Sequence, residues 1–182
     1  MKKAIGLVEY KSIAKGIESA DAMVKSANVE LINSNTICAG KYLNFVTGDV
    51  GAVKNAVAVG TQVGGSYVVD HLLIPNIHPA VFPALLGTCE ISKTGALGVI
   101  ETICVASAIL AADATVKAAN VELIEVRLAN GLGGKAFVTF TGEVSAVKAA
   151  VQSAKAILAD EGTLLETAVL SSPHKSLMEK LI

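Results

Sequence analysis

The chain has 182 residues, of which 52% are hydrophobic and 4% aromatic, with a formal net charge of −1 at pH 7 and a mean hydropathy of +0.58. A near-neutral chain without a basic run is not expected to bind nucleic acid. The most apolar stretch, residues 96–116, contains Glu101 and Asp113. It therefore falls short of the roughly 20 apolar residues of a membrane-spanning helix.

The start of the chain, residues 1–7, lacks the apolar length and the small-residue cleavage site of a signal peptide. We therefore expect a cytoplasmic protein. A small domain has little interior in which to hide apolar surface, so the high apolar content predicts a homo-oligomer with extensive subunit contacts. The cysteines, Cys38, Cys89 and Cys104, are odd in number and show no CxxC spacing, which argues against a disulfide scaffold.

The first half of the chain predicts a series of strands and helices. Residues 4–9 alternate in polarity like a strand. Ser12 has the position of a helix N-cap, and the helix after it places four apolar residues on one face: Ile13, Ile17, Ala20 and Val24. Strands are predicted over residues 29–37 and 42–47, and the loop between them, Thr-Ile-Cys-Ala-Gly-Lys, carries Cys38.

Asp49 is predicted to cap a second helix, which ends at Gly64 and Gly65. A fourth strand covers residues 68–74, and the prolines of residues 75–83 indicate turns and a short last helix. The resulting order, βαββαβ, predicts an α+β layer with two helices on one face of a sheet.

The chain contains an internal repeat. Residues 20–32 recur as residues 112–124 with 11 of 13 positions identical, and residues 47–50 recur as residues 141–144. A period this long, present twice, indicates a duplicated domain and not a solenoid.

The duplication predicts two domains, residues 1–87 and 95–182, joined by a small, polar linker. Corresponding residues of the two copies are 92 positions apart in the first repeated block and 94 apart in the second. The second copy therefore has a two-residue insertion between these blocks, in the loop that corresponds to the Cys38 loop. That second loop, residues 129–135, is rich in glycine and has no thiol.

Four motifs resemble the bacterial microcompartment (BMC) shell domain, and the resemblance covers nearly the whole chain, twice: Ala-Ile-Gly-Leu-Val-Glu, Ala-Asp-Ala-Met-Val-Lys-Ser-Ala-Asn-Val, Gly-Asp-Val-Gly-Ala-Val-Lys and Ile-Pro-Asn-Ile-His-Pro. The resemblance implies an α+β fold of two tandem βαββαβ BMC shell domains. It also implies a pseudohexameric homotrimer that tiles with other microcompartment shell proteins, as a structural protein and not an enzyme.

The loops Thr-Ile-Cys-x-Gly-Lys and Asn-Gly-Leu-Gly-Gly-Lys are similar to those of tandem members with an iron–sulfur cluster at the three-fold axis. This similarity implies that Cys38 is a metal ligand and that each trimer holds one [4Fe-4S] cluster in its central pore. The cluster would carry electrons across the shell, for example to encapsulated redox enzymes. Lys25 and Lys117 correspond to the lysines at the edges between neighbouring tiles.

Other readings of Cys38 remain open at this stage. Three thiolates around a three-fold axis suit a [4Fe-4S] cluster, but also a zinc ion with a water as its fourth ligand. A shell trimer without a cluster, whose pore conducts small metabolites, is the alternative function. A third is an enzyme or ligand-binding module with its site between the copies. Against it, Glu9 and Glu101 are one repeated position and not an acid–base pair.

The remaining candidate residues have structural interpretations. Cys104 occupies the N-cap position of the repeated helix, and Cys89 lies in the linker without a partner at metal-ligand spacing. His78 and His174 are predicted to form turn or interface hydrogen bonds, because no nucleophile or acid is repeated beside them.

Overall fold

The computed structural model describes residues 4–159 and 162–182. The chain divides into two compact units, Met1–Ile77 and His78–Ile182. The predicted start of the first domain, residues 1–3, lies outside the described residues. None of the helices in the described part of the chain is long and apolar enough to cross a membrane.

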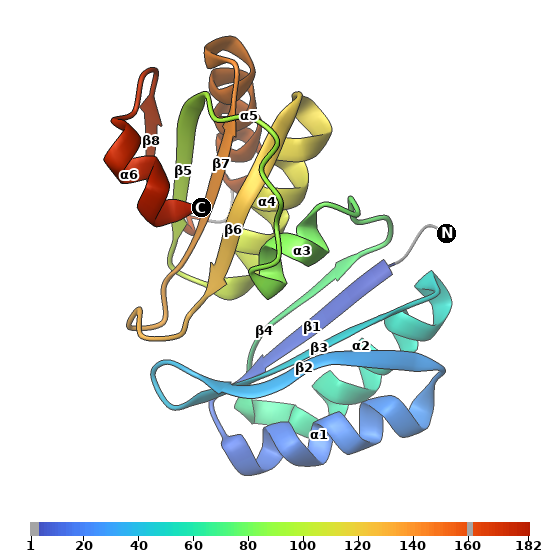
Figure 1. Cartoon of the computed structure of the whole chain (residues 1–182). Coiled ribbons are helices and arrows are strands. Elements are labelled where there is room, and N and C mark those ends of the chain that lie inside the picture. The colour runs from blue at the N-terminus through green and yellow to red at the C-terminus, as the bar shows by residue number, and fades with distance from the viewer. Residues whose placement is uncertain (1–3, 160–161) are drawn as a thin grey trace. The chain divides into compact units, whose positions relative to one another are not determined.

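The first unit has the predicted βαββαβ order (Figure 1). Its antiparallel sheet has the strand order β2-β3-β1-β4. In chain order its elements are β1 (Ala4–Tyr10), α1 (Ile13–Ser26), β2 (Val29–Ile37), β3 (Lys41–Gly48), α2 (Val50–Gly64), a 3-10 turn (Gly65–Tyr67) and β4 (Val68–Ile74).

The second unit repeats this topology, with the strand order β6-β7-β5-β8. Two short helices are added, one before and one after the repeated elements. In chain order the elements are α3 (Val81–Leu86), β5 (Ala96–Thr102), α4 (Val105–Ala118), β6 (Val121–Leu128), β7 (Ala136–Gly142), α5 (Val144–Leu158), β8 (Leu164–Leu170) and α6 (Lys175–Leu181). The predicted α+β class is confirmed.

The core of the first unit lies between its sheet and its helices. Val8 and Tyr10 of β1 pack there against Val53 of α2. The helix lies very close to the sheet at Gly6, where a Cβ atom would be only 2.3 Å from Cγ2 of Val57. A larger residue at position 6 would therefore push the helix away from the sheet.

The helix boundaries follow the local signals in the sequence. Oγ of Ser12 accepts a hydrogen bond from the Lys15 backbone N–H at 3.3 Å, so the predicted N-cap of α1 is confirmed. Helix α2 ends at Gly64 and is followed by Gly65, whose φ of 52° suits glycine. Asp49 holds the N-cap position of α2, but its side chain forms no capping hydrogen bond.

The apolar face that the sequence shows on α1 is not the face that the structure buries. The residues of α1 that are buried are Gly16, Ser19, Ala20 and Met23. Of the predicted face only Ala20 is buried, whereas Ile13, Ile17 and Val24 are exposed. Small residues face the sheet because the helix lies close to it, and a Cβ atom at Gly16 would be 2.5 Å from the ring of Tyr42.

The structure divides the chain about ten residues before the linker that the sequence indicates. The second unit begins at His78, although the sequence assigns residues up to 87 to the first domain. The His78 backbone N–H donates to Oδ1 of Asp113 at 2.7 Å, and α3 packs against β6 and α4. Composition located the polar linker but could not show where the segment before it packs.

Candidate functional site

Cys38 lies at the tip of a tight β-hairpin. Residues 38–40 join β2 to β3, and Ile37 is paired with Lys41 across the base of the turn. Cys38 is half-buried, and the next two residues are exposed. Gly40 has a φ of 74°, and a Cβ atom there would meet nothing within 4 Å. Its backbone conformation, and not lack of space, therefore favours glycine. The Cys38–Ala39 peptide bond is cis.

A buried ion pair holds the base of this hairpin. Nζ of Lys41, the first residue of β3, donates to Oε1 of Glu9 on β1 at 2.6 Å. The Glu9 side chain is 2% exposed and that of Lys41 is 28% exposed. The second carboxylate oxygen of Glu9 is buried and has no hydrogen-bond partner. Removing Lys41 would leave a buried charge without compensation, so the pair fixes the turn that carries Cys38.

The corresponding loop of the second unit has the same anchor but a different turn. Lys135 contacts Glu101, and these side chains are 47% and 33% exposed. The loop backbone has positive φ at four positions: Ala129, Gly131, Gly133 and Gly134. Such angles favour glycine. The backbone conformation of the loop therefore accounts for its glycine-rich sequence, and no phosphate-binding role is needed to explain it. The Glu–Lys pair is thus repeated, and the thiol is not.

The donor set around Cys38 suits a metal only if several chains share it. Within residues 4–159 and 162–182, no three His, Cys, Asp or Glu side chains come together closely enough to hold a metal ion. A half-exposed thiol on an ordered turn can still act as one ligand of a shared site. The assignment of Cys38 as a ligand therefore stays a prediction that depends on the assembly.

The other two cysteines lie in the second unit. Cys104 occupies the N-cap position of α4, as predicted, and its thiol donates to Oγ of Ser107 at 3.0 Å. Cys89 lies in the segment between α3 and β5, and partial burial raises the pKa of its thiol above the usual range. A raised pKa disfavours the thiolate that a metal needs.

The two repeated histidines form turns, as predicted. Nδ1 of His78 accepts a hydrogen bond from the Ala80 backbone N–H at 3.3 Å. Nδ1 of His174 accepts one from the Ser176 backbone N–H at 3.2 Å. The segment that follows each copy of the repeat thus begins with the same hydrogen bond, from a backbone N–H to Nδ1 of the histidine two residues before it.

The two predicted edge lysines lie in the last turns of α1 and α4. Nζ of Lys25 lies 2.6 Å from Oδ2 of Asp21, and both side chains are exposed. Lys117 pairs in the same way with Asp113, whose side chain is almost buried. Sequence reasoning missed these two aspartates, although the repeated Ala-Asp-Ala motif that contains them is visible in the sequence.

The comparisons with known proteins agree with this architecture. The BMC domain family model matches residues 4–77 and 96–173. The bacterial microcompartment shell protein PduT of Citrobacter freundii is 47% identical over 182 residues, which is 100% of this chain and 99% of that protein. The bacterial microcompartment shell protein PduA of the same organism is 51% identical over 59 residues, 32% of this chain and 63% of that protein.

A solved structure is also similar. The crystal structure of a microcompartment protein from Desulfitobacterium hafniense DCB has a TM-score of 0.92 and 41% identity, covering 98% of this chain and 99% of that one. The chain therefore belongs to the BMC domain family, of which it carries two copies in tandem, and it is a homologue of microcompartment shell proteins.

Proposed function

We propose that three copies of this chain form a trimer that serves as a structural tile of a bacterial microcompartment shell. We further propose that the three Cys38 thiols meet at the three-fold axis and hold one [4Fe-4S] cluster. The observation that carries the cluster proposal is the asymmetry of the two hairpins. Only the first presents a thiol at its tip, on a turn held by a buried ion pair.

The shell role is supported by the length of the similarity. A relative that is 47% identical from end to end is named a microcompartment shell protein, and both BMC domains match the family model. A relative of single-domain length, matched over 59 residues, is also named a microcompartment shell protein. Two domains per chain and three chains give six domains, the number in a pseudohexameric ring.

The three-fold arrangement supplies the ligands that one chain lacks. Three Cys38 thiolates would bind three irons of the cluster, and the fourth iron would take water or another small ligand. When bound, the cluster supplies reversible transfer of one electron at the pore, between the cytosol and redox enzymes inside the shell. The Glu9–Lys41 pair keeps each turn in place.

The edge lysines complete the proposal for a tile. Lys25 and Lys117 end equivalent helices and would contact neighbouring tiles of the shell. Their pairing with Asp21 and Asp113 restricts the orientation of the ammonium groups.

Anaerobic purification tests the cluster directly. We expect a coloured trimer with about four irons and four acid-labile sulfides per three chains, and an EPR signal after reduction. Cys38→Ser should lose the colour and the iron, whereas Cys104→Ser, a matched control, should keep both. A cluster signal that persists in Cys38→Ser would contradict the assignment of Cys38 as a cluster ligand. Stoichiometric zinc without iron would favour the zinc site, and colourless protein without metal would favour the metabolite pore.

A further inference from the structure

The β-hairpins of the two units carry different side chains at equivalent positions of their arms. In the first unit these side chains can form hydrogen bonds, and they belong to Ser34 of β2 and to Tyr42 and Asn44 of β3. The strand registers give their counterparts in the second unit as Val126, Ala136 and Val138. All three counterparts are buried. The hairpin with the thiol is thus polar at positions where its twin is apolar.

The three polar side chains form a chain of hydrogen bonds across the two arms. The Tyr42 hydroxyl donates to the backbone carbonyl of Ser34 at 2.9 Å and lies 3.1 Å from Oγ of Ser34. The Ser34 hydroxyl donates in turn to Oδ1 of Asn44 at 2.9 Å. These bonds join β2 to β3 in addition to the backbone pairing of the strands.

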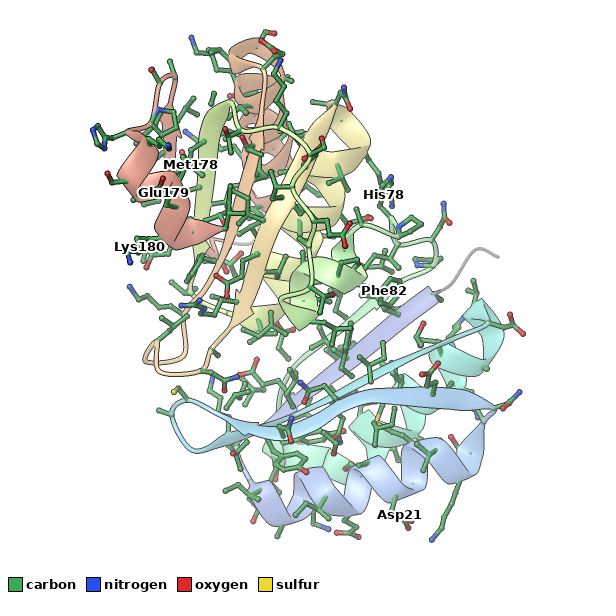
Figure 2. All side chains as sticks on the ribbon, in the orientation of Figure 1. Asp21, His78, Phe82, Met178, Glu179 and Lys180 are labelled. Carbon is green, nitrogen blue, oxygen red and sulfur yellow. The ribbon has the colours of Figure 1, made fainter. Side chains whose placement is uncertain are left out.

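The chain of hydrogen bonds ends on helix α1. Nδ2 of Asn44, a fully buried residue, donates to the Gly16 backbone carbonyl at 2.8 Å. The Tyr42 ring lies against the same glycine, where a Cβ atom would be 2.5 Å from the ring. Figure 2 shows Asp21 on the outer side of α1, away from this contact. Hairpin and helix are therefore joined both by packing and by a buried hydrogen bond.

The Cys38 hairpin is consequently held on both faces of its sheet. Successive side chains of a strand point to opposite faces, so Lys41 and Tyr42 act on different sides. Lys41 pairs with the buried Glu9 on one side, and Tyr42 begins the hydrogen-bonded chain on the other. The second unit repeats the lysine contact, through Lys135, but its apolar side chains cannot form the chain.

A cluster shared by three chains requires that each thiol be placed accurately. Functional groups must lie within about 0.5 Å of the working geometry. A hairpin that moves freely loses conformational freedom when its ligand binds, so order that exists beforehand lowers the cost of binding. Residues that support a ligand from behind commonly change metal affinity by about 10- to 100-fold.

We propose that Ser34, Tyr42 and Asn44 are positioning residues, which hold the Cys38 hairpin against α1 so that the thiol is oriented before the cluster binds. The proposal rests on the proposed cluster and names the residues that prepare each chain for it. The hairpin of the second unit has no thiol to orient and lacks these side chains.

The double variant Ser34→Val with Asn44→Val tests the positioning role in the full chain. It gives this hairpin the valine pair of the second unit. Because both hydrogen-bonding partners are replaced, the urea midpoint should stay near that of wild type. In cluster-free protein the backbone amides of residues 37–41 should exchange about tenfold faster. A chelator should remove iron from the loaded trimer about 10- to 100-fold faster.

Two single variants complete the experiment. Tyr42→Phe keeps the ring against Gly16 and removes only the hydroxyl, so both rates should rise about threefold. Thr47→Val is the matched control. The Thr47 hydroxyl donates to the Ala4 backbone carbonyl at 2.9 Å and is buried at the far end of β3. Its loss removes a buried hydrogen bond from the same strand and should leave both rates unchanged.

The outcomes separate the positioning role from the cluster itself. Unchanged amide exchange and iron loss in the double variant would overturn the positioning role and leave the proposed cluster standing. Equal acceleration in Thr47→Val would also overturn it, because any buried hydrogen bond of the strand would then have the same effect. Wild-type protein that holds no cluster would overturn the proposed function and this inference together. If the double variant fails to fold, Tyr42→Phe decides the question.

Discussion

Nζ of Lys41 lies 2.6 Å from Oε1 of Glu9, which is buried on β1. The contact joins the base of the Cys38 hairpin to the central part of the sheet. Lys135 and Glu101 make the same contact in the second unit, where both side chains are more exposed to solvent. Burial of the pair, and not its presence, therefore distinguishes the hairpin that carries the thiol.

Replacing each lysine in turn measures this difference. Lys41→Met leaves the buried Glu9 charge unpaired and should lower the free energy of unfolding by about 3 kcal/mol. Lys135→Met, the matched control, should cost about 0.5 kcal/mol, because water compensates the exposed Glu101 carboxylate. Urea unfolding of both variants measures the two values. Equal losses would contradict a special role for the buried pair.

The turn itself depends on the backbone of Gly40. Its φ of 74° strains any residue with a Cβ atom, so Gly40→Ala should destabilise the protein by about 1 kcal/mol. Gly51→Ala is the control: Gly51 lies in the first turn of α2 with open space around it, and alanine there should stabilise the helix by about 0.5 kcal/mol. Thermal unfolding should show a lower melting temperature for Gly40→Ala and a higher one for Gly51→Ala. A neutral Gly40→Ala would show that the turn tolerates a different backbone conformation.

The close approach of α2 to β1 makes position 6 sensitive to volume. Gly6→Ala should lower the free energy of unfolding by about 2 kcal/mol, because its Cβ would overlap Val57. Adding Val57→Ala should recover part of that loss by making room, as measured in a double-mutant cycle. Purely additive effects of the two substitutions would show that the helix and strand separate without strain.

A hydrogen-bonded glutamate on β6 gives the protein a pH-dependent contribution to stability. The hydroxyl and the backbone N–H of Ser92 both donate hydrogen bonds to the Glu122 carboxylate. These two bonds, the hydroxyl's being the stronger influence, hold the pKa of that carboxyl below its usual range. A carboxyl with a lower pKa in the folded state stabilises the protein above the unfolded-state pKa, about 4.3. This stabilisation is lost as pH falls through the folded-state pKa.

Ser92→Ala should therefore destabilise the protein by about 0.5 kcal/mol at pH 7, and by less at acidic pH, as Glu122 takes up a proton. Melting temperatures of wild type and variant at the two pH values give the comparison. Glu122→Gln serves as the control, because it should remove the pH dependence of this contact altogether. A difference in melting temperature between wild type and Ser92→Ala that grows as the pH falls would contradict the stabilising role assigned to the ionised Glu122 carboxylate.

Much of the fold was predictable from local signals. The repeat and its polarity pattern predicted βαββαβ twice, and the Ser12 cap and the glycines after α2 located helix ends. These features depend on residues within one or two turns of each other, which sequence spacing shows directly. The position of Cys38 on a turn between strands was predictable for the same reason.

The sequence by itself determined the two repeated domains, their elements and the single thiol in the first loop. Only the tertiary structure decided which side of α1 is buried, that Glu9 is nearly inaccessible to water, and that α3 packs with the second unit. Helical periodicity shows which residues share a face but not which face meets the sheet. Burial depends on contacts between residues far apart in the chain, so α1 and α4, which correspond in the repeat and share 7 of 14 residues, can have different surroundings.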